Sequence, residues 1–224
     1  NTIIGNAFAN SLDGGAGNDS LVGGIGNDTY FVDSAGDVVV EAASEGTDWV
    51  VSTVSHSLGN NLENLTYAGL VNVSLTGNSQ ANVIDGSAAG INTLRGGEGN
   101  DTLVVNSARL GDIDGGTGTN RLRILGDSLS LNDVGLANIQ VLDLGSISTL
   151  AGSVSVTLGG NTTSLDTIIG SAKSDSITAV AGFGNQSITI DGGAGGDRFA
   201  FSSVAQMAAV ASLSGGAGTD TLSF

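Results

Sequence analysis

The sequence of 224 residues contains no cysteine and no proline, few basic residues and a single histidine, His56. Without cysteine a disulfide framework is impossible, and one histidine alone excludes a Cys/His zinc site. Lys and Arg number 6 against 22 Asp and Glu, so the formal charge is −16. This balance excludes binding to a nucleic-acid backbone, which requires basic side chains. No apolar run of about 18 residues occurs, so we expect no membrane span.

Most of the acidic residues are Asp, which number 18 against 4 Glu, and Gly contributes 37 residues. Asp, Asn and Gly favour turns, whereas Val, Ile and Thr favour strands. The chain therefore has the composition of short strands joined by many tight turns. Its hydrophobic fraction of 40% recurs at regular positions, which argues against disorder. We predict an all-β fold.

One hexapeptide, Gly-Gly-x-Gly-x-Asp, recurs along the chain. It occurs five times unchanged, at residues 14–19, 23–28, 96–101, 192–197 and 215–220. A sixth copy, at 115–120, ends in Asn instead of Asp. A large apolar or aromatic residue follows each copy two positions later, which makes a unit of nine residues. Such a fixed short period is typical of solenoids.

Weaker copies extend this register. Residues 5–13 and 32–40 join the first two exact copies into a block of four units. Residues 77–104 form a second block, and a single weak copy occupies 170–178.

Between the blocks, residues 41–76 and 105–191 lose the register but keep alternating apolar stretches, which indicate strands with longer loops. We therefore expect residues 1–104 to be repeat blocks with an irregular insert at 41–76. Residues 105–224 are expected to form an irregular solenoid ending in repeat turns, with one short helix within 202–212. The two regions are predicted to form one continuous solenoid, part of a larger protein.

The motif suits both a tight turn and a hard cation. Glycines permit positive φ, so six residues can turn with their carbonyls inward. The next three residues are extended, and the side chain at position eight points into a narrow core. Two units make one coil, so every second turn stacks on the same side. Ca²⁺, which takes about six to eight carboxylate and carbonyl oxygens, can bind between stacked turns.

These repeats resemble the RTX (repeats-in-toxin) nonapeptide proteins over a little under half the chain. The segments 26–33, 38–41, 45–48 and 62–65 also resemble the longer repeat of large secreted RTX-type surface proteins. The resemblance implies a right-handed parallel β-roll or β-solenoid with calcium-binding turns and some irregular rungs. It also implies type I secretion and folding on calcium binding outside the cell.

The resemblance assigns several Ca²⁺ ions to the motif turns of this chain. The carboxylate ligands at position six are Asp19, Asp28, Asp101, Asp197 and Asp220, with Asp37 and Asp175 in weaker copies. The glycines that would supply main-chain carbonyls are Gly14, Gly15, Gly17, Gly23, Gly24, Gly26, Gly96, Gly97, Gly99, Gly192, Gly193, Gly195, Gly215, Gly216 and Gly218. The alternative is that these are plain Gly-Asx turns capped by Asp.

Stacking sets which turns can share an ion. Turn 14–19 is expected to stack on 32–37, and turn 5–10 on 23–28, whereas an isolated copy such as 192–197 is expected to lack a partner in register. Asn10, Asn82 and Asn120 replace the carboxylate, so sites that use those turns should be weaker or empty. Asp13, Asp114 and Asp191 precede a Gly-Gly pair and are expected to end strands instead of binding metal.

Catalysis has little support in this sequence, and we predict no enzyme. His56 lies on an alternating stretch and is interpreted as a strand or loop residue. The glycine-rich turns lack the Lys and the following helix of a phosphate-binding loop. The few aromatic residues provide no sugar platform, and Trp49, Tyr67, Phe183 and Phe201 are interpreted as packing residues of the core or rung ends.

The leading hypothesis is a calcium-binding structural solenoid of a secreted bacterial cell-surface protein, such as an S-layer protein, adhesin or extracellular filament. Its partners would be calcium and neighbouring rungs or further copies of the chain, with no nucleic acid. The alternative is the carboxyl-terminal calcium-binding and secretion module of a type I-secreted enzyme or toxin.

Overall fold

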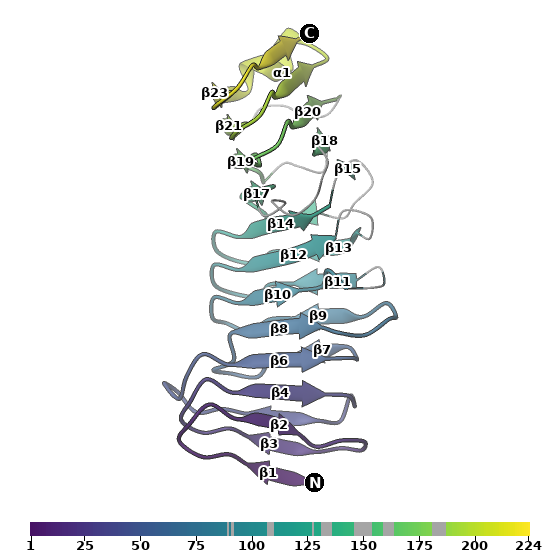
Figure 1. The fold of residues 1–224 in the computed structure, drawn as a ribbon, viewed down its shortest axis with the longest axis vertical. Helices are drawn as coiled ribbons and strands as arrows, with labels where there is room; N and C mark the ends of the chain where they lie inside the picture. Colours follow the sequence, from purple (N-terminus) through teal and green to yellow (C-terminus); the bar gives the residue numbers. More distant parts are fainter. Residues whose placement is uncertain are drawn as a thin grey trace.

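The structure is a computed structural model that describes residues 1–88, 90, 92–106, 110–126, 128–130, 136–145, 154–158, 164–180 and 187–224. Short parallel strands stack into a β-solenoid that runs from the N-terminus at one end to the C-terminus at the other (Figure 1). The predicted all-β solenoid is confirmed.

One face of the solenoid is a single sheet of 11 strands, in which every pairing is parallel. In order along the sheet these strands are β2 (Ser11–Asp13), β4 (Thr29–Val32), β6 (Trp49–Ser52), β8 (Asn64–Tyr67), β10 (Val83–Asp85), β12 (Thr102–Asn106), β14 (Arg121–Leu125), β17 (Val141–Asp143), β19 (Thr167–Ile169), β21 (Ile188–Asp191) and β23 (Val210–Ser214).

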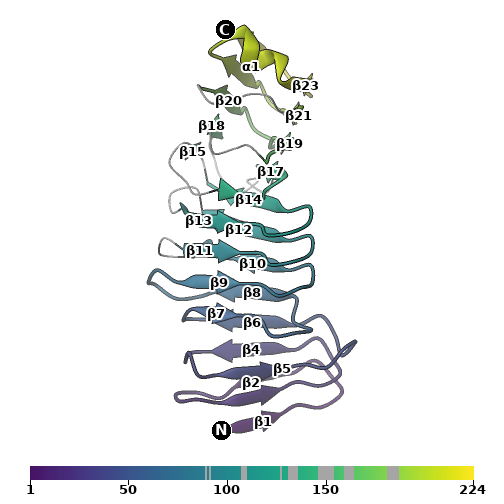
Figure 2. The same cartoon turned by 180° about the vertical axis from the view of Figure 1, so that it is seen from behind.

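The opposite face, seen from behind in Figure 2, is divided into three successive parallel sheets. The first contains β1 (Thr2–Ile4), β3 (Ser20–Val22) and β5 (Val38–Val40). The second contains β7 (His56–Ser57), β9 (Ser74–Thr76), β11 (Asn92–Arg95), β13 (Leu110–Asp114) and β16 (Leu136–Ala137). The third contains β15 (Ser128–Ser130), β18 (Ser155–Leu158), β20 (Ser176–Ala179), β22 (Arg198–Phe201) and β24 (Thr221–Ser223).

The helix α1 (Val204–Ala208) lies within the predicted segment 202–212. Ser203 is its N-cap, and its side chain accepts a hydrogen bond from the backbone N–H of Gln206.

The spacing of paired strands reproduces the nonapeptide repeat. Ser11 pairs with Thr29, which is 18 residues or two units further on. Later rungs differ in length: Trp49 pairs with Asn64 after 15 residues, and Val141 pairs with Thr167 after 26. The irregular stretches are therefore solenoid rungs whose loops change length while strand pairing continues.

The side chain at position eight of each unit points into the core, because alternate residues of a strand face opposite sides. Leu21, Tyr30, Leu103 and Phe199 are all at most 2% exposed. Burying such a side chain contributes about 1.5–3 kcal/mol. Leu222 follows the last copy and is 47% exposed, since it lies at the end of the stack.

The predicted aromatic packing holds only in part. Tyr67 and Phe201 are buried in the core. Trp49 is not a core residue: it starts β6 on the outward side of the sheet, is 44% exposed, and donates from Nε1 to Thr66 Oγ1 at 2.8 Å. Phe183 lies outside the described residues.

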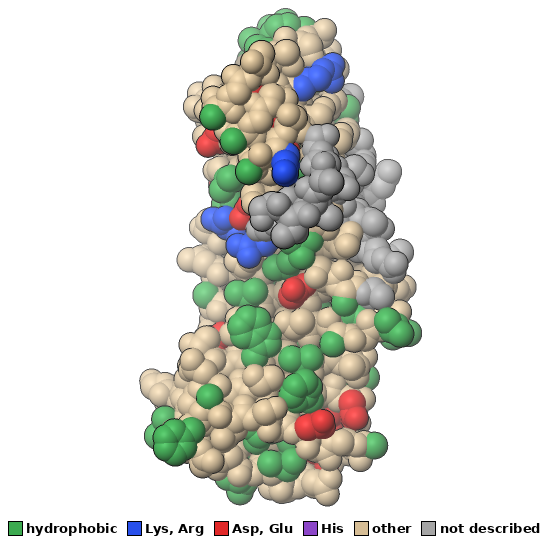
Figure 3. Space-filling view, viewed as in Figure 1, with side chains coloured by type: hydrophobic (Ala, Val, Ile, Leu, Met, Phe, Trp, Pro, Cys, Tyr) green, Lys and Arg blue, Asp and Glu red, His purple; other side chains and the backbone are tan. Residues whose placement is uncertain are grey.

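No helix among the described residues is long and apolar enough to cross a membrane. On the face in Figure 3, Lys and Arg side chains lie only over the upper, C-terminal half of the solenoid. This distribution follows from the sequence, in which the first basic residue is Arg95.

Candidate metal centres

The exact motif copies share one turn geometry. Their glycines at motif positions two and four have φ between 70° and 150°, a region that L side chains rarely adopt. The first glycine is needed for a different reason. A Cβ on Gly96 would clash with Oδ2 of Asp101 and with the carbonyl oxygen of Gly115. The motif carboxylate thus folds back over the start of its own turn, where the next turn also presents a carbonyl oxygen.

Turns on the same side are connected by a ladder of hydrogen bonds between position-six residues. The backbone N–H of Asp19 donates to Asp37 Oδ1 at 3.0 Å, and that of Asn10 donates to Asp28 Oδ1 at 2.6 Å. These bonds confirm the predicted stacking of 14–19 on 32–37 and of 5–10 on 23–28.

The turn at 192–197 has stacked partners on both sides, so the expectation that it would be isolated was wrong. The Asp175 N–H donates to Asp197 Oδ1 at 2.7 Å, and the Asp197 N–H donates to Asp220 Oδ1 at 2.9 Å. The two steps are 22 and 23 residues long instead of 18, yet the hydrogen bonds between the stacked turns are kept.

The ladder satisfies only one oxygen of each exact-motif carboxylate. Oδ2 of Asp19, Asp28, Asp101 and Asp197 is buried and has no hydrogen-bond partner among the described residues. Burial raises the pKa of Asp101 to about 6, although the N–H of Asn82 acts in the opposite direction. Burial also raises the pKa of Asp197. An unpaired buried oxygen of this kind is costly unless a cation or a proton meets it.

The weaker copies differ in this respect. Both oxygens of Asp37 accept backbone N–H groups, from Asp19 on one side and from Asp33 and Ser34 on the other. Asp175 is similarly satisfied, with Ser171 donating its N–H to Oδ2 at 2.6 Å. These two carboxylates therefore have the hydrogen bonding of capped Asx turns. Asp220, in the last copy, is partly exposed.

The Asn turns hold a donor where the Asp turns hold the unpaired oxygen. Nδ2 of Asn120 donates to the carbonyl of Asn138 at 3.0 Å, and more weakly to that of Gly116 at 3.4 Å. Nδ2 of Asn82 donates to the carbonyl of Leu62 at 3.0 Å. The side-chain amide of Asn thus provides these carbonyl oxygens with a hydrogen-bond donor from within the chain.

A second group of carboxylates lies where the repeat register first breaks. One oxygen from each of Asp28, Glu41 and Asp48 lies within 4.8 Å of the others, and all three side chains are buried. Burial, with Asp48, Glu45 and Asp28 close by, raises the pKa of Glu41 to about 8. Burial also raises the pKa of Asp48. Glu41 and Asp48 were not predicted as ligands, although both belong to the segments that resemble the longer repeat.

The three Asp residues that precede a Gly-Gly pair end strands, as predicted. Asp13, Asp114 and Asp191 are the last residues of β2, β13 and β21. Each accepts a backbone N–H from two residues further on, at 2.9 Å for Asp13 and 3.0 Å for Asp114.

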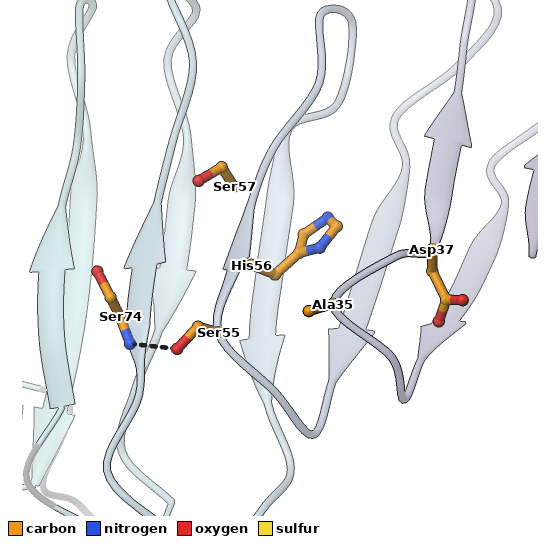
Figure 4. A pocket seen from close by; sticks show the side chains of 6 residues that line it. All are labelled: Ala35, Asp37, Ser55, His56, Ser57 and Ser74. Atoms are coloured by element: carbon orange, nitrogen blue, oxygen red, sulfur yellow. Dashed lines mark hydrogen bonds between the residues drawn. The ribbon is translucent and has the colours of Figure 1, made fainter. Parts of the chain in front are cut away.

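His56 borders a cavity of about 360 Å³ between β5 and β7, where the second face changes sheets. Its lining includes Ser55, Ser57, Ser74 and Asp37 (Figure 4). Burial lowers the pKa of His56, and its Nε2 has no hydrogen-bond partner among the described residues. The Ser55 hydroxyl instead accepts the N–H of Ser74 at 3.0 Å. His56 is thus a strand residue, as predicted, and no serine hydroxyl of the described segments is hydrogen-bonded to it.

Comparison with known families supports the interpretation of the turns. The RTX calcium-binding nonapeptide repeat matches in four copies, over residues 1–30 and 87–107. These residues contain three of the five exact motif copies. No curated protein matches the chain. The chain therefore carries RTX-type calcium-binding nonapeptide repeats within residues 1–30 and 87–107.

Proposed function

We propose that this chain is a calcium-binding structural solenoid of a secreted cell-surface protein, such as an S-layer protein, adhesin or extracellular filament. In this role Ca²⁺ binding drives folding outside the cell and supports assembly with further copies. The chain has no catalytic role in this proposal, and it acts through its elongated solenoid structure.

The observation that carries the proposal is the set of buried, unpaired Oδ2 atoms on Asp19, Asp28, Asp101 and Asp197. Each belongs to an exact motif copy, and at the turns of Asp101 and Asp197 a main-chain carbonyl oxygen of the next turn lies close to the same place. Carboxylate and carbonyl oxygens are the ligands that Ca²⁺ prefers. The motif glycines would supply the carbonyls, and bound Ca²⁺ would supply a positive charge beside the unpaired oxygens; Asp19 already has the N-terminal ammonium at its other oxygen.

Asp37, Asp175 and Asp220 are proposed as further ligands of these turns. For Asp37 and Asp175, binding requires an ion to replace N–H donors that the carboxylates already have. They should therefore contribute less to affinity than the exact-motif residues.

The energetics favour folding in calcium-rich surroundings. Extracellular calcium modules commonly bind with Kd of about 10⁻⁴–10⁻³ M. At a free calcium concentration tenfold above Kd, each site that forms only in the folded state contributes about 1.4 kcal/mol. Four such sites contribute about 5–6 kcal/mol, which is comparable with the whole stability of a typical domain. A chain with these sites would remain unfolded in a cytosol and fold after export.

Exposed apolar side chains support the assembly part of the proposal. Phe31 and Trp49 are 40% and 44% exposed on neighbouring strands of the long sheet, and Leu70 is almost fully exposed. Hydrophobic side chains gather over the lower half of the face in Figure 3. Contiguous exposed apolar surface commonly marks a protein–protein contact.

Sedimentation velocity tests this function directly. The chain is measured in EDTA and then in about 5 mM Ca²⁺, which exceeds the expected Kd. We expect a slow, expanded species in EDTA that becomes compact on adding calcium, and conversion to large polymers would support a lattice or filament. Identical sedimentation in both buffers would refute calcium-driven folding.

A further inference from the structure

Three acidic side chains converge beside the first irregular rung. Asp28 ends a motif turn before β4, Glu41 directly follows β5, and Asp48 directly precedes β6. They are 1%, 7% and 1% exposed, and one oxygen of each lies within 4.8 Å of the other two. Only Asp28 belongs to an exact nonapeptide motif.

The hydrogen bonds of this cluster leave one oxygen unpaired on every carboxylate. Asp28 Oδ1 accepts the Asn10 N–H at 2.6 Å, and Asp48 Oδ1 accepts the Asp28 N–H at 2.8 Å. Glu41 Oε1 accepts from the Tyr30 hydroxyl. The remaining oxygens, Asp28 Oδ2, Glu41 Oε2 and Asp48 Oδ2, are buried without a partner among the described residues.

The surrounding chain cannot neutralise these charges. Residues 1–94 contain ten acidic residues and no Lys or Arg. The space-filling view agrees, because no basic side chain appears over the lower half of that face (Figure 3). Buried charges in proteins are paired or bound to metal, and no ion pair among the described residues involves these three carboxylates, so a bound cation is the partner that fits them.

We propose that Asp28, Glu41 and Asp48 form a cation site for Ca²⁺ that differs from the motif turns by its third carboxylate. An oxygen separation of up to 4.8 Å fits two Ca²⁺–oxygen bonds of about 2.3–2.6 Å each. Three carboxylates also give this site more negative charge than a motif turn, which favours tighter binding of a divalent cation.

The position of the site indicates its role. The sheet β1-β3-β5 ends at β5, and β7 begins a new sheet without pairing to it. Glu41 lies immediately after that last strand, while Asp48 leads into β6 of the uninterrupted sheet. An ion bound by all three carboxylates would hold segment 41–48 against the preceding rung. This is the point where strand pairing on the second face is lost.

The test compares Glu41→Gln with Glu98→Gln in the full chain. Both variants remove one negative charge, but Glu98 is exposed on a different rung. Binding of Ca²⁺ is measured by equilibrium dialysis, and Tb³⁺ is used as a luminescent probe. Tyr30 contacts Glu41, and Trp49, the only Trp in the chain, follows Asp48, so both can sensitise Tb³⁺ bound here. Loss of an outer-shell partner already weakens metal binding about 10–100-fold, so loss of a ligand should cost at least about tenfold.

We expect Glu41→Gln to lose one tightly bound ion and most of the sensitised emission, while Glu98→Gln matches the wild type. Equal stoichiometry, affinity and emission in Glu41→Gln and wild type would overturn the site. Absence of sensitised emission from the wild type would overturn it without any variant, so the test does not depend on the variant folding.

The inference depends on the proposed function only through Asp28, and Asp101→Asn separates the two. If Asp101→Asn reduces calcium binding and Glu41→Gln does not, only this inference fails. If the wild-type chain binds no calcium, the proposed function fails with it.

Discussion

Replacing Asp101 by Asn should stabilise the calcium-free protein while weakening its response to calcium. The pKa of the Asp101 carboxyl rises from 3.8 to about 6 in the folded chain, because burial disfavours its charged form. At about 1.36 kcal/mol per pKa unit, keeping this carboxylate ionised costs the metal-free fold on the order of 3 kcal/mol at neutral pH. Asn is nearly isosteric and can still accept the Asn82 N–H, which Asp101 now accepts at 2.8 Å.

The sign of the pH dependence follows from the raised pKa. The folded state holds the Asp101 proton more tightly than the unfolded state, so this contribution to stability is complete below about pH 4. It is lost as the pH rises through about 6 and stays lost above that. The Asp101→Asn variant has no carboxyl at this position, so its stability should not show this fall with rising pH.

Far-UV circular dichroism measures the folded fraction in EDTA, and urea unfolding measures the stability at increasing free Ca²⁺. Glu98→Gln is the matched control, because its exposed side chain belongs to the same turn and loses the same charge. We expect Asp101→Asn to have a larger folded fraction than wild type in EDTA and a smaller slope of stability against the logarithm of calcium concentration. Destabilisation by a similar amount in EDTA and in calcium would refute the idea that the unpaired oxygen is a cation ligand.

Three further changes test the turns and the core. Asn120→Asp removes the amide donor to Asn138, so it should lower stability in EDTA and increase the number of ions bound at saturation, as measured by equilibrium dialysis. Gly96→Ala should destabilise by about 1–3 kcal/mol or more through overpacking, whereas Gly59→Ala, where a Cβ meets only ordinary contacts, should cost little; equal melting temperatures would contradict this. Leu103→Ala should cost about 2–5 kcal/mol in urea unfolding, by the same amount at each calcium concentration that folds the chain, because it removes core volume and no ligand.

Much of the fold could be predicted from the sequence because the repeat is local. The nine-residue period places a glycine turn and an inward side chain in every unit, and residues such as Leu21 and Phe199 are buried accordingly. The stacking of 14–19 on 32–37 followed from counting two units per coil. The ends of strands at Asp13, Asp114 and Asp191 followed from the Gly-Gly pairs after them.

For the irregular rungs, counting repeat units could not predict which turns stack on one another. Their loops vary from unit to unit, so the distance in sequence no longer gives the neighbour in space. The turn at 192–197 was therefore predicted to be isolated, although it stacks on both sides. Trp49 was assigned to packing by its residue type, but its position at the start of β6 directs it outward.

The repeat, the parallel solenoid and the carboxylates at the motif turns could be predicted from the residues alone, because each of these depends on one or two units. Which of those carboxylates already have hydrogen-bond partners is visible only in the folded chain. Asp37 and Asp101 occupy equivalent places in their units, yet backbone N–H groups meet both oxygens of Asp37, whereas Oδ2 of Asp101 has no partner among the described residues. The proximity of Asp28, Glu41 and Asp48 could not be predicted either, because it depends on how a rung of altered length packs against its neighbour.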